Sequence, residues 1–180
     1  ATESASESTN CNAYFNHPGI SVTASSGDAG LGLNFPAACP NVTAVGGTTL
    51  NTSGAETAWH TSSTVGAGGG CSARIAIPAW EVQSVTNCAR RAVSDVSAVA
   101  DPNTGVYVYD TFGQNGGLQV GGTSASSPII AATFALAEGT SGSTSSASVP
   151  WTRRTNGCLN TVGGVTYAFQ SGLGSPNGIN

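Results

Sequence analysis

Gly121-Gly122-Thr123-Ser124-Ala125-Ser126-Ser127-Pro128 joins a flexible glycine turn to an apolar run over Ile129 to Ala137. The apolar run predicts a helix, and Pro128 is expected in its first turn, where a missing N–H donor costs nothing. The first N–H groups of a helix lack partners within it and the helix dipole is positive there, so an oxyanion beside Ser124 would be stabilised. Ser124 is therefore a candidate nucleophile, and a serine helix cap is the alternative.

A second motif combines a strand with an acid. Residues 20–26 alternate and are rich in β-branched side chains, which predicts a strand, and the segment ends abruptly at Gly27-Asp28-Ala29-Gly30. Open α/β sheets place their chemistry at the carboxyl ends of strands, so Asp28 is a candidate site residue. A turn residue held by local hydrogen bonds is the alternative.

Ser25-Ser26-Gly27-Asp28 and the segment 122–128 together resemble the paired signatures of the sedolisins, the serine-carboxyl peptidases with a subtilisin-like fold. Other stretches resemble family sequence in the family's order: 14–19, 35–38, 42–48, 95–102 and 172–178. The resemblance implies an α/β fold, namely a partial subtilisin-like, doubly wound, mostly parallel sheet with flanking helices. It also implies that residues 1–180 form a single domain equivalent to the C-terminal part of a family catalytic domain.

The resemblance assigns Ser124 as the nucleophile and Asp28 as the protonated acid that stabilises the tetrahedral intermediate. An ionised carboxylate would repel an oxyanion, so this role requires acid conditions or a desolvated site. The Glu-x-x-x-Asp helix that supplies the family's base has no match here. Glu3 and Glu7 have that spacing, but they lie in a polar segment without an apolar stripe and are expected at the surface. A serine without a positioned base is a weak nucleophile, so the isolated chain is expected to be inactive.

Two hypotheses follow from the resemblance to the sedolisins and from the lack of a match to their Glu-x-x-x-Asp helix. In the first, this is one chain of a two-chain acid peptidase that acts on peptides or proteins, with the base on an N-terminal companion chain. In the second, it is a catalytically inactive, sedolisin-derived extracellular structural or binding protein that self-associates. Both expect a partner, because removal of the family's first strands and helices would expose a sheet edge and one flank of the Ser124 helix.

No cofactor is expected. Alignment with the family pattern places Thr161 and Ala168 where the two aspartates of its calcium site would stand. Calcium affinity depends on anionic oxygens, so no tightly held ion is predicted. His17 is expected at a helix end and His60 at the surface, because a Ser-His pairing does not fit the resemblance.

Charge is scarce in this chain. Only 8% of residues are charged and the net charge is −4, which disfavours a nucleic-acid or membrane surface. The pairs Arg90-Arg91 and Arg153-Arg154 are expected to be solvated.

Five cysteines predict an oxidising, extracellular location. Cys71 and Cys88 resemble a family pair whose closure would add about 3 kcal/mol. Cys11 and Cys39 are a plausible second bridge, which leaves Cys158 over. The spacings do not match a zinc pattern.

The remaining pattern predicts further elements. A short helix is expected near 12–16, strands at 20–25, 41–45, 55–59, 93–99 and 106–109, and a low-complexity surface loop at 140–148. Pro78-Ala79-Trp80 suggests an aromatic wall. The glycines of 66–70 and 116–117 are expected to flank a cleft and pair with an extended substrate.

Overall fold

The computed structural model describes residues 3–137 and 145–178. Its helices are α1 (Glu7–Phe15), α2 (Gln83–Thr86), α3 (Thr123–Leu136) and α4 (Ser148–Arg153). Its strands are β1 (Thr23–Ser25), β2 (Thr43–Leu50), β3 (Glu56–Ala58), β4 (His60–Ser62), β5 (Val65–Gly66), β6 (Gly70–Cys71), β7 (Ala92–Val93), β8 (Val96–Val99), β9 (Val106–Asp110), β10 (Gly116–Val120), β11 (Leu159–Asn160) and β12 (Ser175–Pro176).

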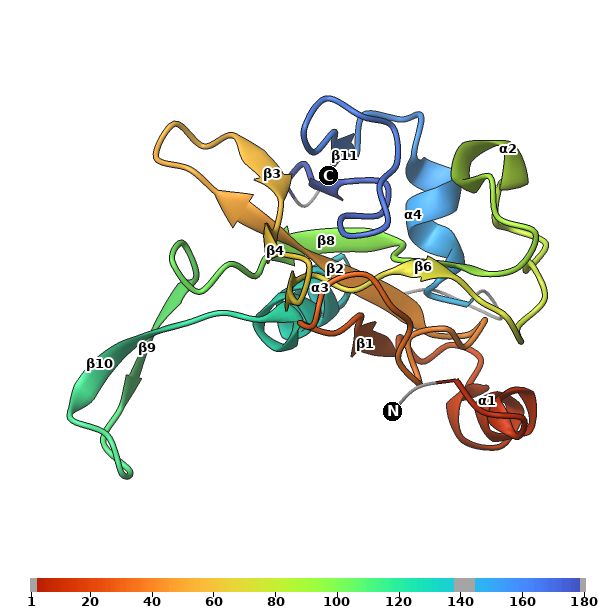
Figure 1. Cartoon of the computed structure of the whole chain (residues 1–180), viewed down its shortest axis with the longest axis horizontal. Helices are drawn as coiled ribbons and strands as arrows, with labels where there is room; N and C mark the ends of the chain where they lie inside the picture. The colour runs from red at the N-terminus through yellow and green to blue at the C-terminus, as the bar shows by residue number, and fades with distance from the viewer. Residues whose placement is uncertain (1–2, 138–144, 179–180) are drawn as a thin grey trace.

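Strand β2 is the centre of the main sheet (Figure 1). It runs parallel to β1 on one edge and to β8 on the other, and its end pairs antiparallel with β3. Residues 43–48 of β2 are all buried, as is typical of a strand in a parallel sheet that is covered on both faces. The other strands form two-stranded antiparallel ribbons around this sheet.

Helix α3 packs against β1, β2 and β8. Its Ile130 is buried against Val45 and Val96 of the sheet. A glycine in β2 permits the close approach of the start of the helix, because a Cβ at Gly47 would lie 3.3 Å from Cγ2 of Thr123. The contact with β2 therefore fixes the distance between the sheet and the N-terminus of α3.

Several predicted elements differ in extent. The strand expected at 20–25 is ordered as β only from Thr23, and Ile20 is 62% exposed. The helix expected near 12–16 begins earlier, at Glu7. The strand expected at 93–99 is split into β7 and β8, because the chain turns at Asp95 to place its carboxylate in the interior.

Both expected disulfides are present, Cys11–Cys39 and Cys71–Cys88. The first attaches α1 to the segment before β2, and the second closes the loop that leads to β7. Cys158 is a free, half-buried thiol.

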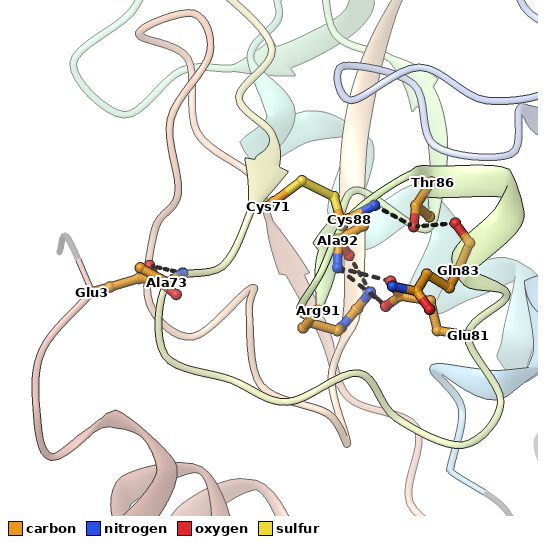
Figure 2. The surroundings of a disulfide bond; sticks show 9 residues. All are labelled: Glu3, Cys71, Ala73, Glu81, Gln83, Thr86, Cys88, Arg91 and Ala92. Carbon is orange, nitrogen blue, oxygen red and sulfur yellow. Dashed lines mark hydrogen bonds and ion pairs between the residues drawn. A yellow bond between two sulfur atoms is a disulfide. The ribbon is translucent and has the colours of Figure 1, made fainter.

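The expectation that Arg91 is solvated is wrong, because its side chain is fully buried. It donates to Asp95 at 2.6 and 2.8 Å, to Glu81 at 3.1 Å and to the Ala92 carbonyl. Figure 2 shows the Arg91 side chain extending toward Glu81, with Ala92 beside it. Burial disfavours the Arg91 charge, but the carboxylates of Asp95 and Glu81 outweigh it and raise its pKa. Burial also raises the pKa of Glu81, although Arg91 opposes that shift.

Trp80 belongs to the same interior cluster. The Arg91 guanidinium carbon lies 4.9 Å from the Trp80 ring centroid, and the Trp80 ring is 6.1 Å from that of Trp151. Trp151 donates its indole N–H to Asp95 at 2.7 Å. The aromatic residue expected to form a wall is half-buried, and its ring covers a buried ion network.

Residues 4–6 of the N-terminal segment are exposed as expected, but Glu3 is half-buried and Glu7 is buried, so the expectation that these two acids lie at the surface is wrong. Glu3 accepts hydrogen bonds from the Ala73 N–H at 2.9 Å and from the Ser72 hydroxyl. Figure 2 shows Glu3 reaching Ala73. Glu7 is fully buried, and burial, followed by the nearby charge of Glu3, raises its pKa.

The β9–β10 hairpin projects from the body of the molecule (Figure 1). Tyr107, Tyr109 and Phe112 on it are 75%, 74% and 93% exposed. The helices of the described residues are too short or too polar to cross a membrane.

The loop expected at 140–148 lies mostly outside the described residues, because residues 138–144 are not described. Its described end is structured rather than a surface loop. Ser146 is buried and accepts a hydrogen bond from Thr43, and Ser148 begins α4.

Candidate active site

The two predicted site segments meet at the start of α3. Oδ1 of Asp28 accepts hydrogen bonds from the Thr123 N–H and from the Thr123 hydroxyl, both at 2.7 Å. Asp28 follows β1 and Thr123 opens α3, 95 residues later. The carboxylate therefore caps the helix from a distant segment, a structural role that the sequence did not indicate.

Gly122 explains why a distant cap fits. It is the N-cap residue of α3 with φ +91° and has no side chain to cap with. A Cβ at Gly122 would lie 2.8 Å from Oδ2 of Asp28. Only glycine leaves the space that the Asp28 carboxyl occupies.

Ser124 is the second residue of α3, and its side chain is exposed. The alternative of a serine cap is wrong, because the cap position belongs to Gly122. Within the described ranges the Ser124 N–H finds no backbone acceptor and its hydroxyl makes no hydrogen bond. A free hydroxyl, a free N–H and a positive helix end thus lie together, which suits a carbonyl oxygen that gains negative charge.

Pro128 lies deeper in the helix than predicted. The helix begins at Thr123, before the apolar run, so Pro128 is its sixth residue rather than part of its first turn. A proline at this position supplies no N–H to the carbonyl four residues earlier, which belongs to Ser124. The backbone of Ser124 is therefore less tied into the helix than that of its neighbours.

Buried hydroxyls that sequence reasoning missed fix the helix over the sheet. Ser126 is fully buried, accepts the Ala98 N–H at 2.8 Å and donates to the Gly46 carbonyl at 2.8 Å. Ser127 donates to the Thr23 hydroxyl at 3.0 Å. The run of small polar residues in the motif was the available signal, since a helix that buries hydroxyls must satisfy them with nearby backbone groups.

The glycine segment 66–69 has a different partner from the expected one. Its backbone pairs with the Asp28 segment: the Gly66 N–H donates to the Asp28 carbonyl at 3.1 Å and the Gly68 N–H to Gly27 at 2.7 Å. Gly116 and Gly117 pair with β9 inside the hairpin. These hydrogen bonds are unavailable to a substrate strand, and the first set holds the Asp28 turn in place.

The acids Glu3 and Glu7 and the two histidines contact groups other than Ser124 or lie exposed. The carboxylate of Glu3 binds the loop after β6, and Glu7 accepts the N–H of Ser4. His60 is exposed on β4, as predicted. His17 is exposed beyond α1 and contacts the Tyr14 carbonyl at 3.0 Å, in agreement with the expected helix-end position.

The residues at the expected calcium positions do not fit a tightly bound ion. Thr161 is exposed and Ala168 has no side-chain donor, so neither supplies the anionic oxygens that calcium requires. Within 3–137 and 145–178, no group of three or more His, Cys, Asp or Glu side chains could hold a metal ion.

Known proteins are similar to this chain over part of their length. No family model matches the chain. Sedolisin of Pseudomonas sp. (strain 101) is 37% identical over 113 residues, which cover 57% of this chain and 19% of the relative. Kumamolisin of Bacillus sp. (strain MN-32) is 36% identical over 138 residues, which cover 65% of this chain and 24% of the relative.

Solved structures support the same relationship. Pseudomonas sedolisin, a serine-carboxyl proteinase complexed with two molecules of pseudo-iodotyrostatin, superposes with a TM-score of 0.70 at 30% identity, covering 88% of this chain and 53% of that chain. Sphericase, at 19% identity and a TM-score of 0.62, shares the fold alone and covers 98% of this chain and 54% of its own. The predicted subtilisin-like α/β fold class is confirmed. The chain spans about half the length of these structures and is similar to the sedolisins over the region it shares with them.

Proposed function

We propose that this chain carries the nucleophile and the oxyanion-stabilising acid of an acid serine peptidase that cleaves peptides or proteins. Ser124 is the nucleophile and Asp28 is the acid. The observation that supports the proposal is the pair of 2.7 Å hydrogen bonds that Asp28 accepts from Thr123, the residue before the exposed Ser124 at a helix N-terminus. The relatives named sedolisin and kumamolisin support the peptidase class.

The reaction begins when Oγ of Ser124 attacks the carbonyl carbon of a peptide bond. A C–O bond forms, the carbonyl electron pair moves to oxygen, and the serine proton passes to a carboxylate base. The oxyanion accepts hydrogen bonds from the Ser124 N–H and from the protonated Asp28. The base then protonates the leaving amine, the C–N bond breaks, and water hydrolyses the acyl ester.

The carboxylate base comes from outside the described residues. We assign it to a Glu-x-x-x-Asp helix on an N-terminal companion polypeptide, so the isolated chain is inactive or nearly so. Two disulfides suit an extracellular location, and the role of Asp28 suits acid conditions.

Peptide hydrolysis at about pH 4 tests the proposal. Material that retains its companion should cleave an unstructured peptide, and Ser124→Ala should abolish cleavage. Ser62→Ala, at an exposed serine on β4, is the matched control and should leave cleavage unchanged. Mass spectrometry should find the companion in equal amount. Cleavage that survives Ser124→Ala would refute the assignment.

The exposed aromatic hairpin favours a second candidate function. Tyr107, Tyr109 and Phe112 on β9–β10 form an apolar surface of the kind that serves protein association. In this reading the chain is an inactive extracellular binding protein that self-associates. Homogeneous chain that shows no hydrolysis, and whose mass in sedimentation rises with concentration and falls on Phe112→Ser, would favour it over the peptidase.

A further inference from the structure

The two oxygens of the Asp28 carboxyl have different surroundings. Oδ1 accepts two hydrogen bonds from Thr123, both at 2.7 Å. Oδ2 lies over Gly122 and, among residues 3–137 and 145–178, receives no hydrogen bond. An oxygen that already accepts two donors has little room for a proton of its own. When Asp28 is protonated, the proton therefore belongs on Oδ2.

The direction of the Thr123 hydroxyl is fixed by its neighbours. Thr123 is fully buried, and its Oγ1 lies 3.1 Å from the Gly27 N–H, which can only donate. The hydroxyl accepts there, so its single proton points to Asp28. Its methyl group faces Gly47 of β2, where a Cβ would lie 3.3 Å away. The sheet and the Asp28 turn thus hold this side chain from two sides.

We propose that Thr123 is a positioning residue that makes Oδ1 of Asp28 the acceptor and keeps Oδ2 as the oxygen that donates to the oxyanion at Ser124. The inference rests on the proposed function, and it assigns to Thr123 a task distinct from nucleophilic attack. Thr123 does not touch the substrate. It acts through the orientation of the Asp28 carboxyl.

Two substitutions separate the hydroxyl from the methyl group. Thr123→Val keeps the shape and the backbone N–H but removes the hydroxyl, whereas Thr123→Ser keeps the hydroxyl and removes the methyl. In material that retains the companion chain, Thr123→Val should lower kcat about tenfold or more relative to wild type, because a misplaced donor weakens transition-state binding. The KM of this variant should stay within about twofold of the wild-type value. Ser should retain kcat within about threefold. Equal kcat in Val and wild type, or an equal loss in Val and Ser, would overturn the inference.

Amide exchange gives a second readout that needs no activity. The N–H of residue 123 should lose protection about tenfold in Thr123→Val, because Asp28 is no longer held, and should keep it in Thr123→Ser. Equal protection in both variants would overturn the positioning role. If wild-type material shows no hydrolysis that depends on Ser124, the proposed function fails, and the exchange result alone then decides whether Thr123 orients Asp28.

Discussion

Replacement of Asp28 separates its structural role as a helix cap from the proposed chemical role. Asp28→Ala removes the distant cap of α3 and leaves the buried Thr123 hydroxyl without its acceptor. Loss of a helix cap costs about 0.5–2 kcal/mol, and water that reaches the exposed Asp28 site can replace part of the second hydrogen bond. We expect about 1–2 kcal/mol in total, equivalent to a fall in Tm of about 2–8 °C for a domain of this size.

Asp28→Asn is the informative partner, because its carbonyl oxygen still accepts both hydrogen bonds from Thr123. It should lose less than about 0.5 kcal/mol while it cannot act as a carboxylic acid. Thermal unfolding followed by circular dichroism at one pH gives the comparison. Asp110→Ala, at an exposed aspartate whose carboxylate accepts only the Phe112 N–H within the hairpin, is the control. The reasoning is refuted if Asp28→Ala leaves Tm unchanged or if Asn and Ala destabilise the fold equally.

Three further predictions concern the interior, the N-terminus and the disulfide. Arg91→Met leaves two buried carboxylates without a cation and should cost about 3–5 kcal/mol in urea unfolding, whereas Arg90→Met at the exposed neighbour should cost almost nothing. The pKa of Glu7 in the folded protein is raised above 4.5, so its contribution to stability is complete below pH 4.5. That contribution is lost as the pH rises through the folded pKa. Glu7→Gln should therefore reduce the difference in unfolding free energy between about pH 4 and about pH 6.5. Replacement of Cys71 and Cys88 by serine together should lower the unfolding free energy by about 3 kcal/mol, and an unchanged urea midpoint would contradict the loop-entropy argument.

Local patterns in the sequence predicted the parts of the fold that depend on local chemistry. The glycine turn before Ser124 and the acid after β1 are short motifs, and hydrogen bonds from Thr123 to the Asp28 carboxylate join them in the structure. The strands predicted at 20–25, 41–45, 55–59 and 93–99 all contribute to the main sheet, whereas the one at 106–109 belongs to the β9–β10 hairpin; β1 is shorter than its alternation suggests. Resemblance to a family supplied the Cys71–Cys88 pairing, which spacing alone does not give.

Burial of charge was the part that the sequence could not predict. Arg91 follows another arginine, and its burial depends on Glu81 and Asp95, whose positions are known only in the folded chain. Glu7 is buried in a segment without an apolar stripe, because the Cys11–Cys39 disulfide and the contacts of Glu3 hold it down. Nonlocal partners determined each case, so no local window contained the signal.

The long-range cap of α3 makes the surroundings of Ser124 depend on the rest of the fold. The cap of this helix comes from a residue 95 positions earlier, so it exists only where the turn after β1 lies against the start of α3. A nascent or loosened polypeptide would carry the same hydroxyl without the aligned amide and acid. The exposed hydroxyl, the Thr123 amide and the Asp28 carboxylate therefore come together only in the assembled fold.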